Sequence, residues 1–178
     1  MSTEVKVYCY YLPDKTADGR SVSWKLLERV LGVTSFSQLN FGEHGKPYLA
    51  NGPFFSISDE DGLTVLAVCD KEVGADLHQI GIADEAVVRR YFTEQEYRDF
   101  LQTPEDEKPL VFGMLWSRIE SSLKCIGTGL DLDFRKHREL IDHLKVKHQV
   151  LEGGYMLACA CEEDFDVRLI DSKEIMEK

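Results

Sequence analysis

The sequence lacks any run of the ~20 apolar residues that a membrane-spanning helix needs, so no contact with a membrane is expected. Its first twelve residues carry charges at Glu4 and Lys6 and alternate like a strand, without the basic region and apolar run of a secretory signal. Cysteine is sparse: five residues, an odd number, lie scattered along the chain. They are expected to be reduced thiols rather than a disulfide framework, which points to the cytoplasm.

Positive charge is also scarce. The chain has 21 Lys and Arg against 32 Asp and Glu, a formal net charge of -11. Because affinity for a phosphate backbone comes mainly from Lys and Arg, no nucleic-acid partner is expected. The sequence also has no glycine-rich phosphate loop with a lysine, no His-Glu-x-x-His helix and no nucleophile elbow.

What is present suffices for one domain: 178 residues, 43% of them hydrophobic, with no linker rich in proline, glycine or serine and no tandem repeat. Residues 59–62 end in Asp-Gly and are expected to turn, and the pair Thr93 and Glu96 predicts a capping box. Cys159 and Cys161 are expected to be buried as small hydrophobes rather than to bind metal. The patterns predict strands over 4–12, 54–58, 63–69, 73–80, 155–161 and 167–170, and helices over 22–31, 86–91, 94–101 and 110–125.

Two short segments hold carboxylates at fixed positions. In residues 72–78, the period of two in a strand places Gly74, Asp76 and His78 together on one face. In residues 116–124, helical spacing aligns Trp116, Glu120 and Lys124 in one stripe. An acidic and a basic side chain therefore project from the same edge of the helix.

These segments resemble the two signatures of the 4'-phosphopantetheinyl transferase superfamily. That family pairs a glycine, a variable residue and an aspartate on a strand with a helix that reads tryptophan, two variable residues, lysine, glutamate, serine, and a lysine four residues past the glutamate. Three further landmarks, in residues 45–49, 54–58 and 154–160, follow the order of its longer, surfactin-synthetase-activating type. The resemblance runs from about Arg20 to about Phe165.

The resemblance implies an α+β fold in which two related halves, about 1–72 and 73–178 of a single domain, pack as a pseudo-dimer with coenzyme A between them. It implies transfer of 4'-phosphopantetheine from coenzyme A to a serine of an acyl or peptidyl carrier protein, with Mg²⁺ or Mn²⁺, and we expect the chain to act as a monomer. Asp76 and Glu120 would hold the metal against the diphosphate. Mg²⁺ suits this role because it accepts one or two carboxylates together with substrate phosphate oxygens.

Further roles follow from the same resemblance. His78 stands where relatives have a third acidic ligand, so it is a candidate metal ligand, although a histidine that only hydrogen-bonds in the cleft fits equally well. Glu120 and Lys124 are the candidate catalytic residues, and Lys46, Ser58 and Lys124 the candidates for binding coenzyme A. The proton of the acceptor serine would pass to Glu120 or to a water. Without the resemblance, Asp76 would be an ordinary turn residue and Glu120 with Lys124 a surface pair.

Three positions depart from the family pattern. Besides His78, Ile119 replaces the lysine that precedes the glutamate. Asp59 replaces a histidine that contacts a phosphate of coenzyme A, and a carboxylate beside a phosphate repels it. The loop therefore either turns away from the nucleotide or marks a site that is no longer tuned for it. The alternative to the enzyme is therefore a non-catalytic homologue that binds carrier protein or coenzyme A.

Overall fold

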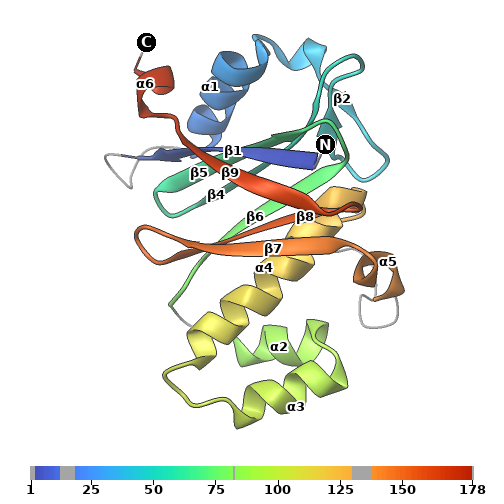
Figure 1. Ribbon diagram of the computed structural model, residues 1–178, viewed down its shortest axis with the longest axis vertical. Coiled ribbons are helices and arrows are strands. Elements are labelled where there is room, and N and C mark those ends of the chain that lie inside the picture. Colours follow the sequence, from blue (N-terminus) through green and yellow to red (C-terminus); the bar gives the residue numbers. More distant parts are fainter. Residues whose placement is uncertain (1–2, 13–18, 82, 130–137, 178) are drawn as a thin grey trace.

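The computed structural model describes residues 3–12, 19–81, 83–129 and 138–177. Its elements form the predicted α+β fold (Figure 1). The helices are α1 (Gly19–Leu31), a 3₁₀ turn (Phe36–Gln38), α2 (Glu85–Tyr91), α3 (Glu94–Gln102), α4 (Lys108–Ile126), α5 (Glu139–Asp142) and α6 (Lys173–Met176). The strands are β1 (Thr3–Tyr11), β2 (Asn40–Phe41), β3 (Pro47–Tyr48), β4 (Phe54–Glu60), β5 (Leu63–Cys69), β6 (Val73–Gln79), β7 (Lys145–Leu151), β8 (Tyr155–Cys161) and β9 (Phe165–Asp171).

Two sheets organise the molecule. The first has the strand order β4-β5-β1-β9 and the second the order β6-β8-β7, and β2 pairs with β3 in a small separate ribbon. All neighbours are antiparallel except β1 and β9, which run parallel. The last strand of the chain therefore completes the sheet that begins with the first strand. The division into two halves at about residue 73 stays a prediction. The strand β9 follows that boundary in the sequence but pairs with β1, which precedes it.

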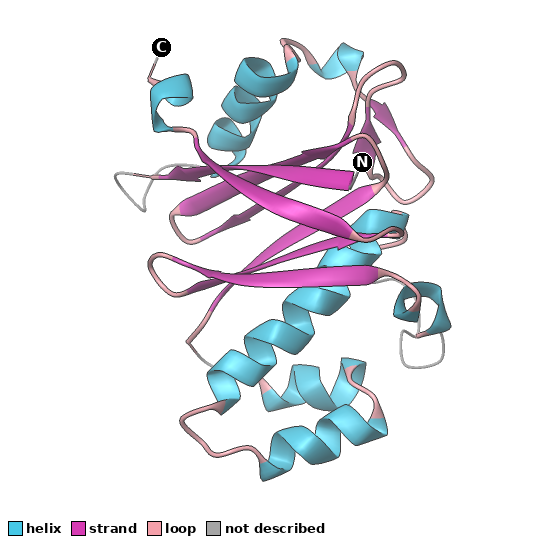
Figure 2. Cartoon of the chain, in the orientation of Figure 1, coloured by secondary structure: helices cyan, strands magenta, loops and turns pink. Residues whose placement is uncertain are grey.

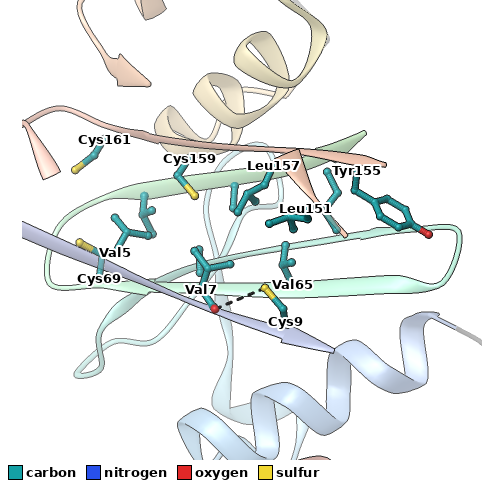
Figure 3. Packing of buried hydrophobic residues seen from close by; sticks show 14 of the residues in the cluster. Val5, Val7, Cys9, Val65, Cys69, Leu151, Tyr155, Leu157, Cys159 and Cys161 are labelled. Carbon is teal, nitrogen blue, oxygen red and sulfur yellow. Dashed lines mark hydrogen bonds between the residues drawn. The ribbon is translucent and has the colours of Figure 1, made fainter. Parts of the chain in front are cut away.

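Figure 2 shows the layers that result: α1 on one side of the first sheet, the second sheet on its other side, and α4 beyond the second sheet. One core cluster fills the space between the two sheets, where Val5 and Val7 of β1 face Leu157 and Cys159 of β8 (Figure 3). A second cluster joins α4 to α2, α3 and α5, and a third packs α1 on the first sheet. The apolar residues of these clusters come from alternating positions of the strands and from helically spaced positions of the helices.

The predicted boundaries hold with small changes. Thr93 and Glu96 form the expected capping box at the start of α3, and Gly127 ends α4 in the left-handed conformation, with φ 74°. The turn expected over residues 59–62 is narrower: β4 continues through Glu60, and Asp61 and Gly62 make the turn with positive φ. Asp59 is therefore a strand residue.

All five cysteines are free and buried, and Cys159 and Cys161 are fully covered in the core between the sheets, as predicted. Within the described ranges, no helix combines the length and apolar character needed to cross a membrane.

Candidate active site

The contact between β6 and α4 builds the site. A Cβ atom on Gly74 would lie 1.8 Å from the carbonyl oxygen of Ser121 and 2.4 Å from the amide nitrogen of Cys125, so only glycine fits there. Because side chains alternate along a strand, Asp76 and His78 share the face of Gly74, which packs on α4. The two predicted signature segments are therefore packed directly on each other.

Asp76 is buried and bound by two partners. The Nζ atom of Lys124 lies 2.7 Å from Asp76 Oδ1, and Ser58 Oγ donates a hydrogen bond of 3.2 Å to the same oxygen. Ser58 Oγ in turn accepts hydrogen bonds from Lys124 Nζ at 3.1 Å and from the amide of Leu77 at 3.1 Å. Burial raises the pKa of Asp76, while Lys124 and Ser58 oppose that shift. The structure thus brings together three predicted site residues from β4, β6 and α4.

Glu120 lies one turn before Lys124 on the same helix. Burial raises its pKa to about 7, the charge of Asp76 adds to the shift, and Lys124 opposes it. Among the described residues its carboxylate has no hydrogen-bond or ion-pair partner. A buried carboxylate whose charge raises the pKa of a second, unpartnered carboxylate forms with it a donor set that a hard divalent cation would stabilise. Asp76 and Glu120 therefore fit the predicted metal.

His78 packs against a part of α4 about two turns before Glu120, while its charge still interacts with that of Asp76. Its ring meets Phe112 edge-on, with ring centroids 5.1 Å apart, and a Cβ on Gly113 would contact its Cδ2 at 3.4 Å. Its Nε2 is buried without a hydrogen-bond partner, and burial lowers its pKa, so the ring is neutral near pH 7. In the part of the chain that the structure describes, no three His, Cys, Asp or Glu side chains gather as a metal site. The structure thus favours the alternative in which His78 is not a ligand.

Lys46 supports the end of α4. Its Nζ donates to the carbonyl oxygens of Cys125 at 2.8 Å and Val73 at 3.3 Å, and it forms an ion pair with Glu72. A cation at the carboxyl end of a helix is favourable because the last carbonyls there lack partners. A nucleotide would have to compete with these contacts for the Lys46 amine. The role of Lys46 in binding coenzyme A stays a prediction.

Ile119 faces away from the site. Its side chain is buried in the core that α4 shares with α2 and α3. Trp116 lies on that side too and packs against Phe112 and Tyr91, as expected for a core aromatic.

Two adjoining pockets open beside the end of α4, and Glu120 lines the first of them. The first, of about 270 Å³, is bounded by Glu120 and Lys124 on one side and by Ser56 on β4 on the other. The second, of about 560 Å³, shares Lys46 and Phe55 with it. Together they reach the size of a cofactor site. Sequence reasoning did not assign a site role to three further lining residues, although Phe55 lies in the landmark 54–58: His44, Phe55 and Gly127.

Comparison with known proteins gives a consistent result. Residues 72–167, more than half of the chain, match the family model described as the 4'-phosphopantetheinyl transferase superfamily. The chain is 29% identical over 153 residues to 4'-phosphopantetheinyl transferase Sfp of Bacillus subtilis, a match that covers 75% of this chain and 68% of the relative. It is 35% identical over 89 residues to psf-1 of Bacillus pumilus (49% and 38%) and 31% identical over 107 residues to gsp of Aneurinibacillus migulanus (60% and 45%).

The family match covers both signature segments, from the residue before Val73 to beyond Lys124. Its boundaries also contain the strand β8 that pairs with β6. The matches to Sfp, psf-1 and gsp confirm the surfactin-synthetase-activating type as well. The match over more than half of its length shows that this chain belongs to the 4'-phosphopantetheinyl transferase superfamily.

Proposed function

We propose that this chain transfers 4'-phosphopantetheine from coenzyme A to a serine of an acyl or peptidyl carrier protein, with Mg²⁺ or Mn²⁺. The observation that carries the proposal is the convergence of Asp76, Glu120 and Lys124 beside an open pocket. The buried carboxylate of β6, together with an unpartnered carboxylate and a cation one helical turn apart on α4, forms a site suited to phosphoryl transfer. Such reactions depend mainly on positioning and on neutralising charge.

The metal would be held by Asp76 and Glu120. When bound, it would neutralise charge on the diphosphate of coenzyme A. Lys124 is fixed by Asp76 and Ser58, so its ammonium is already oriented without help from the substrate. It would bind a phosphoryl oxygen and offset the charge that develops during transfer.

In the transfer, the serine oxygen of the carrier protein bonds to the β-phosphorus of coenzyme A. The phosphoanhydride bond of that phosphorus breaks, and adenosine 3',5'-bisphosphate departs. The serine proton leaves to Glu120 or to a water. With a pKa of about 7, Glu120 is well matched to accept a proton near neutral pH, since a general base works best close to the working pH. Binding of the metal would lower that pKa, which keeps the water route open.

Mass spectrometry tests the proposal. Apo carrier proteins of both kinds are incubated with the chain, coenzyme A and Mg²⁺ or Mn²⁺, and we expect the mass of one phosphopantetheine on the acceptor serine. The variant Glu120→Gln should lose transfer while it stays folded. Glu107→Gln, an exposed change at the start of the same helix, serves as the matched control and should retain it. Transfer by Glu120→Gln at the rate of the wild type would remove Glu120 from its role.

A second candidate is a homologue that binds carrier protein or coenzyme A without transfer. The observation that favours it is Ile119, which leaves the core side of α4 without the cation found in the family pattern. Binding of coenzyme A by calorimetry, together with no modification of any tested carrier, would support this candidate and exclude the first.

A further inference from the structure

Side chains of β4, the outer strand of the first sheet, hold the outer edge of β6 in the second sheet. The amide of Ala75 donates a hydrogen bond of 3.0 Å to Ser56 Oγ, and the amide of Leu77 donates one of 3.1 Å to Ser58 Oγ. Both pairs are 19 residues apart, so β4 and β6 run side by side in the same direction. Side-chain oxygens thus take the place that the carbonyl groups of a neighbouring strand fill within a sheet.

A third contact continues the series. Burial raises the pKa of Glu60, and a hydrogen bond from the amide of Gln79 to its carboxylate opposes that shift. The acceptors are therefore three alternate residues of β4, and the donors are three alternate residues of β6. Because successive amides of a strand point to opposite edges, these donors face away from β8, which pairs with the other edge of β6.

Ser56 lies at the border of the candidate active site. Its side chain is buried, and it lines the pocket that Glu120 and Lys124 also line. The amide that it holds belongs to Ala75, which is fully buried and directly precedes Asp76 in β6. A buried amide that loses its acceptor is costly, because it cannot turn to water instead. The hydroxyl of Ser56 therefore keeps this edge of β6 closed on β4.

Asp76 is thereby held from three directions. Gly74 packs on α4, β8 pairs with the inner edge of β6, and Ser56 and Ser58 hold the amides of the residues before and after Asp76. A carboxylate that shares a cation with Glu120 needs this precision, since Mg²⁺ binds oxygens at about 2.1 Å and tolerates little deviation. A small shift of β6 would change the spacing between the two carboxylates.

We propose that Ser56 is a positioning residue for the metal: through the backbone of β6, it sets the spacing between the carboxylates of Asp76 and Glu120. This inference rests on the proposed function, in which these two carboxylates bind Mg²⁺ or Mn²⁺. Ser56 acts without contacting the metal. Groups that orient metal ligands in this way change metal affinity by about tenfold or more when they are removed.

Binding of Mn²⁺ alone, followed by electron paramagnetic resonance of the free ion, tests the assignment. The site is the component of binding that Glu120→Gln removes, which separates it from the other carboxylates of this acidic chain. Ser56→Ala should raise the Kd of that component about tenfold. Ser56→Thr keeps the hydroxyl and suits a strand, so its Kd should stay within about threefold of the wild type.

The transfer assay gives a second readout. In Ser56→Ala, the Mn²⁺ concentration for half-maximal rate should rise by about tenfold, while kcat at saturating Mn²⁺ should fall by less than about threefold. A variant that is merely less stable would not show this split, because the folded fraction changes the rate at every metal concentration.

Ser172→Ala is the matched control. Ser172 is fully buried as well, and its hydroxyl donates at 3.4 Å to the carbonyl oxygen of Ile170. It lies between β9 and α6, which packs on α1 and β1 rather than on α4. The control variant should lower the melting temperature and leave the Kd for Mn²⁺ within about twofold of the wild type.

A Kd for Mn²⁺ in Ser56→Ala within about twofold of the wild type, with a lowered melting temperature, would make Ser56 a structural residue only and overturn the proposal. If Ser56→Ala does not fold, Ser56→Cys replaces it, because sulfur fills the space but is a weaker acceptor. Its Kd should rise at least about threefold, and an unchanged Kd would again overturn the proposal.

The outcomes also separate this role from the proposed function. Binding that Ser56→Ala weakens, without transfer to any carrier protein, would support the positioning role and refute the transfer alone. If the wild type has no Mn²⁺ binding that Glu120→Gln removes, the metal of the proposed function is refuted, and the positioning role is overturned with it.

Discussion

Gly74 on β6 lies so close to Ser121 on α4 that its missing side chain is what lets the strand and the helix touch. The Ser121 carbonyl oxygen would be 1.8 Å from a Cβ on that residue. Everything proposed for the site depends on this contact, because it sets Asp76 of β6 beside Lys124 of α4.

Gly74→Ala should therefore force β6 and α4 apart. We expect the free energy of unfolding to fall by about 3 kcal/mol, at the upper end for overpacking a core, because the atoms in conflict are backbone and cannot rotate away. Urea denaturation followed by circular dichroism measures this loss. The matched control is Gly113→Ala on the same helix, where a Cβ meets only an ordinary contact at 3.4 Å and alanine favours the helix. A small loss of stability in Gly74→Ala, comparable to that control, would contradict the close contact.

The raised pKa of Glu120 predicts a dependence of stability on pH. The unfolded chain ionises this group near its ordinary value of 4.5, and the folded chain near 7. Between these values the unfolded state holds fewer protons, so the group's contribution to the free energy of unfolding falls as the pH rises and is constant above about 8.

Glu120→Gln should remove that loss. The variant is expected to exceed the wild type by about 3 kcal/mol in free energy of unfolding at pH 8 and to match it near pH 4.5. Urea titrations without divalent metal at the two pH values give the comparison, with Glu107→Gln as the exposed control. If the free energies of unfolding of Glu120→Gln and the wild type differ by the same amount at both pH values, the carboxyl group of Glu120 titrates normally.

Lys46 has two possible roles that one variant separates. Lys46→Met removes the amine that contacts Glu72 and the carbonyl of Cys125, and the free energy of unfolding should fall by about 1 kcal/mol. Lys71→Met, which breaks only the exposed 3.4 Å pair with Glu163, should cost less than about 0.5 kcal/mol. If the amine also binds the nucleotide, Kd for coenzyme A should rise about tenfold in the first variant. An unchanged Kd would make Lys46 a support of α4 alone.

Much of the site could be predicted because its residues lie in two continuous segments. The period of two in β6 and the helical spacing in α4 fix which side chains share a face, and the order of the segments then identifies the family. The pairing of Asp76 with Lys124 follows from those faces once Gly74 brings them together. Strand alternation and helical spacing predict these faces correctly because each rule concerns residues within one element.

What could not be predicted depends on contacts between elements distant in sequence. His78 shares a face with Asp76, but alternation does not tell which turn of α4 it meets, and that turn carries Phe112 and Gly113 rather than Glu120. Lys46 binds the end of a helix some eighty residues away. The strand β7 escaped detection because it forms the edge of its sheet and mixes Lys145, Lys147 and apolar residues without clean alternation.

The parallel pairing of β1 with β9 has a consequence for how the chain is made. Because β1 and β9 lie more than 150 residues apart, the ribosome delivers β1 long before β9, and one edge of β1 stays unpaired until residues 165–171 have been made. An unpaired edge can recruit strands from other chains, and loops this long close slowly. Nascent or truncated chains that end before Phe165 are therefore the forms most exposed to aggregation, and a solubility tag will protect best if it is released only after synthesis is complete.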